Sequence, residues 1–130
     1  MTKKEYIEYW LKSAAEDLAT LNYLLKGRRY LHALFFGHLY PEKICKALWV
    51  KNNKDNYPPK IHNLLTLVKQ AEISLDEKDQ LFLLKLNQYQ AEGRYPEDLD
   101  KLKAITNKQL TLAYIENIKT IAKCLHKKML

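Results

Sequence analysis

Three polar side chains recur at four-residue steps along one predicted helix: His38, Glu42 and Lys46. This spacing places all three on one helix face, within reach of one another. The simplest interpretation is an ion pair between Glu42 and Lys46. The functional interpretation is a polar patch that offers Lys46 or the neighbouring Lys43 to a phosphate, and His38 to a base or a ribose.

A lone histidine, His62, follows a loop that ends in two prolines, at the start of the third predicted helix. It either bonds free backbone groups near that helix or lies at the mouth of a cleft, where a neutral imidazole can hydrogen-bond a ligand. His38 and Glu42 would supply only half of a metal site, and no other cluster completes it. We therefore expect neither a bound metal nor another cofactor.

The pair Arg94–Tyr95 is the loop segment that most suggests contact with a ligand, because the chain has only three arginines against nineteen lysines. A guanidinium can fork onto a phosphate or a carboxylate, and a tyrosine ring can stack on a base. In the alternative, structural interpretation, Arg94 tethers its loop to a carboxylate such as Glu42, while Tyr95 packs against the protein. The residues alone leave both interpretations open.

Five helical segments must position these side chains, since apolar residues recur in steps of three and four along most of the chain. We expect helices over residues 5–26, 29–50, 61–71, 75–90 and 106–128, with loops over residues 51–60 and 91–98. Gly27 would end the first helix in a left-handed conformation. Pro41 would kink the second without breaking it. Two capping boxes, Ser74 with Glu77 and Thr106 with Gln109, would begin the last two.

Composition supports a single all-α domain over residues 1–130. The chain has 47% apolar residues, few glycines and prolines, and a formal net charge of +7. The expected fold is an up-and-down antiparallel bundle of four long helices plus a short one. The excess of lysine suits either solubility or an anionic partner such as nucleotide or RNA. With no signal peptide and no membrane-length apolar run, we expect a cytoplasmic protein with free thiols at Cys45 and Cys124.

The last predicted helix carries a second apolar line, formed by Leu112, Ile115 and Ala122 and ending at Met129. A helix that is apolar on two sides either lies centrally in its own bundle or meets a partner chain. We expect a homodimer, the commonest way to cover such a surface.

Four segments taken in order resemble the HEPN family (higher eukaryotes and prokaryotes nucleotide-binding domain). They are Trp10 with Ala14, Asp17 and Leu18; Tyr30 with HLYPEKICKAL (His38–Leu48); HNLLTL (His62–Leu67); and GRYPED (Gly93–Asp98). The resemblance covers residues 5–125 and implies a dimerising bundle of four or five helices. It also implies that the chain pairs with a minimal nucleotidyltransferase in a toxin–antitoxin-like module.

The resemblance implies either nucleotide binding or metal-independent ribonuclease activity, because the family includes both. Its ribonucleases carry an arginine and a histidine separated by four to six residues. This chain lacks that spacing: three residues separate Arg28 from His32, and eight separate Arg29 from His38. Pro41 is a second departure, in a helix where the family usually has a small helix former.

The most favoured function is therefore a non-catalytic nucleotide-binding module, with no catalytic residue assigned. Its candidate binding residues are His38, Glu42, Lys43, Lys46, His62, Arg94 and Tyr95. One alternative is a ribonuclease toxin in which Arg94 stabilises the phosphate and His62 or His38 acts as acid or base. The other is a purely structural interaction protein.

Overall fold

The computed structural model describes all 130 residues and contains no β-strand. Three long helices dominate it: α1 (Lys3–Lys26), α2 (Tyr30–Asn52) and α6 (Lys108–Lys127). Shorter helices connect α2 to α6, namely α3 (Leu64–Gln70), α4 (Glu77–Leu86), the 3₁₀ turn η1 (Asn87–Tyr89) and α5 (Pro96–Ile105). The predicted all-α class is confirmed, but only three helices are long, where the sequence suggested four.

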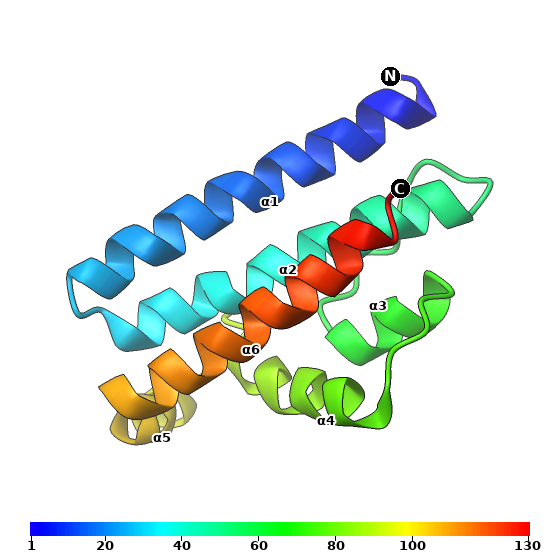
Figure 1. Cartoon of the computed structure of the whole chain (residues 1–130). Helices are drawn as coiled ribbons and strands as arrows, with labels where there is room; N and C mark the ends of the chain where they lie inside the picture. The colour runs from blue at the N-terminus through cyan, green and yellow to red at the C-terminus, as the bar shows by residue number, and fades with distance from the viewer.

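Helices α1 and α2 form an antiparallel pair joined by a three-residue turn (Figure 1). Thr2 and Glu5 cap the start of α1 reciprocally, each side chain accepting a hydrogen bond from the other's backbone amide. The helix ends at Lys26 as expected, but Gly27 has a φ of −79°, and Arg28 takes the left-handed conformation with a φ of 59°. The left-handed residue of this turn is therefore Arg28, one position after the predicted Gly27.

Helix α2 lies between α1 and α6 and is the central element of the molecule (Figure 1). It continues without interruption through Pro41, and fourteen of its residues are buried. At Gly37 a side chain would meet Ile118 Cδ1 of α6 at 2.9 Å, so the absence of a Cβ lets these two helices approach closely. The core of the protein follows the length of α2.

The second half of the chain differs from the sequence-based prediction in its helix boundaries. The cap of α4 is Asp76, not Ser74, and the cap of α6 is Asn107, not Thr106; each bonds the backbone amide three residues on. The Thr106 hydroxyl instead donates to the Leu102 carbonyl. Residues 96–105 form α5, a helix that the sequence-based prediction lacks. Proline at the first position and acidic residues in the first turn favour a helix start there.

The second apolar line of α6 lies largely inside the molecule. Ile115 and Ala122 are buried in the core, Met129 packs against it, and Leu112 is 44% exposed. Burial within this chain therefore accounts for most of that line, and only Leu112 is substantially exposed. None of the helices combines the length and apolarity that crossing a lipid bilayer requires.

Candidate functional site

The middle of α2 buries three ionisable side chains on one face, as the four-residue spacing indicated. His38, Glu42 and Lys46 are 1%, 3% and 7% exposed. Lys46 Nζ lies 3.1 Å from Glu42 Oε2 and 5.3 Å from the centre of the Trp10 ring on α1. The ion pair and the cation–π contact together satisfy the Lys46 ammonium inside the protein.

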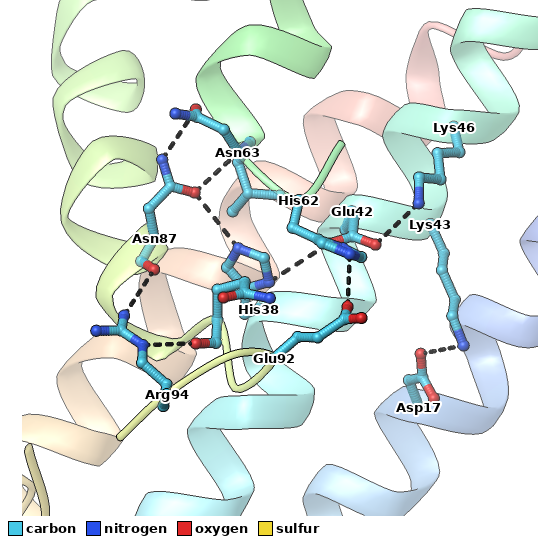
Figure 2. A network of polar contacts seen from close by, with 12 residues as sticks. Asp17, His38, Glu42, Lys43, Lys46, His62, Asn63, Asn87, Glu92 and Arg94 are labelled. Carbon is cyan, nitrogen blue, oxygen red and sulfur yellow. Dashed lines mark hydrogen bonds and ion pairs between the residues drawn. The ribbon is translucent and has the colours of Figure 1, made fainter. Parts of the chain in front are cut away.

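The carboxylate of Glu42 also holds His62, which lies in the extended segment just before α3. His62 Nδ1 lies 3.2 Å from Glu42 Oε1, while its Nε2 lies 2.7 Å from Glu92 Oε2 (Figure 2). Glu42 is buried, but Glu92 belongs to the loop before α5 and its side chain is 75% exposed. The His62 ring is therefore held from within the protein and presents its other nitrogen to the surface.

Asn87, at the junction of α4 and η1, joins this network to two other segments (Figure 2). Its Oδ1 accepts a hydrogen bond from the Leu64 amide at 2.9 Å and lies 3.3 Å from His38 Nε2. Its Nδ2 donates to Asn63 Oδ1 at 3.0 Å. One amide side chain thus fixes the start of α3 and the orientation of the buried histidine on α2.

Burial dominates the electrostatics of the α2 face. It lowers the pKa of His38, although the nearby Glu42 carboxylate and the bond to Asn87 act in the opposite direction. The same burial, with the Glu42 charge, raises the pKa of the Cys45 thiol to about 12. His38 is therefore held neutral, and Cys45 stays protonated.

Arg94 closes the loop that carries Glu92, and it does so without a carboxylate partner. Its Nε donates to the Gln90 carbonyl at 2.8 Å, and its Nη2 donates to the carbonyls of Asn87 and Gln88. The suggested tether to Glu42 is wrong, because these bonds go to backbone oxygens at the end of η1. Arg94 instead fixes the backbone conformation from which Glu92 projects.

The remaining predicted site residues point elsewhere. Lys43 Nζ lies 2.7 Å from Asp17 Oδ2 on α1 and points away from His62 (Figure 2). The Tyr95 side chain makes no hydrogen bond, and the residue is 71% exposed. The structure thus brings His38, Glu42 and His62 together with Lys46 beside them, and it leaves Lys43 and Tyr95 apart.

An open cavity of about 460 Å³ lies beside His62. Its wall consists of the side chains or backbone of His62, Asn63, Asn87, Gln90, Glu92 and Gly93. A second cavity of about 320 Å³ shares His62, Gln90 and Glu92 with the first and extends over Phe35 and Leu39 of α2. Both volumes fall in the range of small-ligand sites.

Two of the four segments named in the sequence resemblance, His62–Leu67 and Gly93–Asp98, contribute residues to the first cavity. A comparison with family models identifies the family. The model of the HEPN domain matches residues 7–127. The chain belongs to the HEPN domain family. No curated protein and no solved structure is significantly similar to this HEPN chain.

Five residues of the first cavity are not among the binding residues predicted from the sequence: Asn63, Asn87, Gln90, Glu92 and Gly93. Glu92 lies in the same predicted loop as Arg94, two positions before it, but nothing in its local sequence indicates a role in binding. Asn63 caps α3, and Asn87 follows α4, which are ordinary positions for asparagine. No three His, Cys, Asp or Glu side chains are placed to hold a metal ion.

Proposed function

We propose that this HEPN domain is a non-catalytic nucleotide-binding module whose ligand lies in the cavity beside His62. The observation that carries the proposal is the arrangement of His62 in the cavity wall, held through Nδ1 by buried Glu42 and in contact through Nε2 with the exposed Glu92. Burying Glu42 and Lys46 is costly, and a polar network of this kind is common where a ligand must be oriented. The resemblance to the HEPN family indicates that this ligand is a nucleotide.

The ribonuclease alternative has less support. Cleavage through the ribose hydroxyl needs one group to take a proton, a second to protonate the leaving oxygen, and a cation near the phosphate. His62 is the only histidine with a half-exposed ring at the cavity, since His38 is buried. The Nε and Nη2 donors of Arg94 are committed to backbone carbonyls.

Two partners are proposed from the family resemblance: a minimal nucleotidyltransferase and a second copy of the chain. Two exposed leucines of α4, Leu81 and Leu84, and the partly exposed Leu112 of α6 offer apolar surface for such contacts. Light scattering of the purified protein tests the homodimer, which a monomeric mass at micromolar concentration would contradict. Co-purification with the nucleotidyltransferase tests the first partner.

Calorimetric titration with nucleosides and nucleotides tests the binding function. We expect saturable binding to the wild type and a loss of about tenfold in affinity for His62→Ala, the effect of one lost hydrogen bond. His126→Ala, which removes an exposed imidazole on α6, is the matched control and should bind normally. No binding tighter than about millimolar by the folded wild type would favour the interaction-protein alternative.

A further inference from the structure

The charges around the cavity indicate which part of a nucleotide it can hold. The first cavity has no lysine or arginine in its wall, and Nε2 of its one histidine, His62, already contacts Glu92. The nearby cations are engaged elsewhere: Lys46 with Glu42, Lys43 with Asp17, and Arg94 with backbone carbonyls at the end of η1. Phosphate groups bind most tightly where cations converge, and no lysine or arginine lines this wall.

We propose, on the basis of the nucleotide-binding function above, that the cavity recognises the nucleoside, base and ribose together, and leaves the phosphates in solvent. Asn63 keeps an Nδ2 donor that makes no hydrogen bond within the protein and matches an acceptor on the edge of a base, whereas the amide of Asn87 already bonds Leu64 and Asn63, and that of Gln90 faces the backbone of Glu92. The connected cavity adds an apolar strip formed by Phe35 and Leu39, against which the face of a base can pack.

Glu92 is the residue suited to the ribose. Its carboxylate is largely exposed at the junction of the two cavities, and its Oε2 is 2.7 Å from His62 Nε2. A carboxylate in this position can accept hydrogen bonds from the two ribose hydroxyls, as acidic residues do in other nucleotide sites. The same negative charge repels phosphates, so Glu92 favours a nucleoside over its polyphosphate.

A phosphate series tests the proposal on the intact protein. The four ribonucleosides and their 5′-mono-, di- and triphosphates are titrated by calorimetry at about 50 mM and about 300 mM salt. For the preferred base, we expect affinities within about threefold across the series and no strong salt dependence. Affinity that rises about tenfold with each phosphate and falls with salt would overturn the proposal while leaving nucleotide binding intact. Binding by none of the series would overturn both.

A ribose-specific comparison assigns the role of Glu92. We expect 2′-deoxynucleoside to bind the wild type about five- to tenfold more weakly than the ribonucleoside, and Glu92→Gln to remove most of that difference. Glu97→Gln, the same change at an exposed position in the first turn of α5, should preserve it. A deoxy penalty that persists in Glu92→Gln would show that Glu92 does not contact the ribose and would overturn its assignment.

Discussion

His62 follows Glu42 by twenty positions in the chain, yet His62 Nδ1 lies 3.2 Å from Glu42 Oε1. The same buried carboxylate lies 3.1 Å from Lys46 Nζ and 3.6 Å from His38 Nδ1. A single side chain of α2 therefore balances the charges of the helix interior and orients the histidine at the cavity. This double role makes Glu42 the most informative residue to change.

Glu42→Gln should destabilise the protein by about 3 kcal/mol, because it leaves the buried Lys46 ammonium without a counter-charge. Urea unfolding followed by circular dichroism measures the change. Glu8→Gln removes a carboxylate of the same kind from an exposed ion pair with Lys4 and should cost less than about 0.5 kcal/mol. Equal effects of the two substitutions would contradict the importance of the buried network.

Stability should fall as the solution is acidified below the ordinary pKa of histidine, 6.5. Burial lowers the pKa of His38 in the folded protein, so the unfolded chain takes up a proton first. The stability that the neutral His38 ring contributes is fully present above pH 6.5. It is lost progressively as the pH falls toward the lowered pKa of His38 in the folded protein. His38→Gln should flatten this part of the profile in urea unfolding between about pH 7.5 and about pH 5.

The exposed His126 provides the control for that experiment. His126→Gln should retain the wild-type slope, because His126 is exposed on α6 and lies outside the buried network of α2. A pH dependence of stability that survives in His38→Gln and disappears in His126→Gln would contradict its assignment to His38.

Asn87→Ala should reduce both stability and ligand affinity. The substitution leaves the Leu64 amide without its acceptor and frees Asn63 and His38, at a cost of about 1–3 kcal/mol. Asn87→Asp keeps the acceptor for Leu64 and should retain more of the stability. Parallel unfolding and binding measurements on the two variants check this order, which an equal loss in both would contradict.

Arg94→Ala should loosen the loop before α5 without changing the charge of the cavity wall. Three backbone carbonyls at the end of η1 lose their shared donor. Limited proteolysis should then cleave residues 90–95 faster than in the wild type. Arg94→Lys should not restore protection, because an ammonium cannot reproduce the planar fork. Unchanged cleavage in Arg94→Ala would show that the loop is held by other contacts.

The sequence predicted the polar face of α2 because helix geometry alone brings His38, Glu42 and Lys46 together. It also indicated His62, but only the fold places that ring on Glu42. Asn87 and Glu92 could not be found in this way, since their roles arise from contacts across segments that no local pattern records. Arg94 was correctly recognised as unusual, yet its partners are backbone oxygens, which sequence patterns do not identify.

The short turn between α1 and α2 has a consequence for the order in which the molecule assembles. Two long helices joined by three residues can pair early, because little chain entropy opposes their contact. The site, in contrast, needs residues 61–93 to fold back over α2. Detachment of that segment alone would admit water to Glu42 and His38 while the helical hairpin stays intact. We then expect the hydrogen-exchange protection of residues 61–93 to report a partial opening of the protein and not its global unfolding.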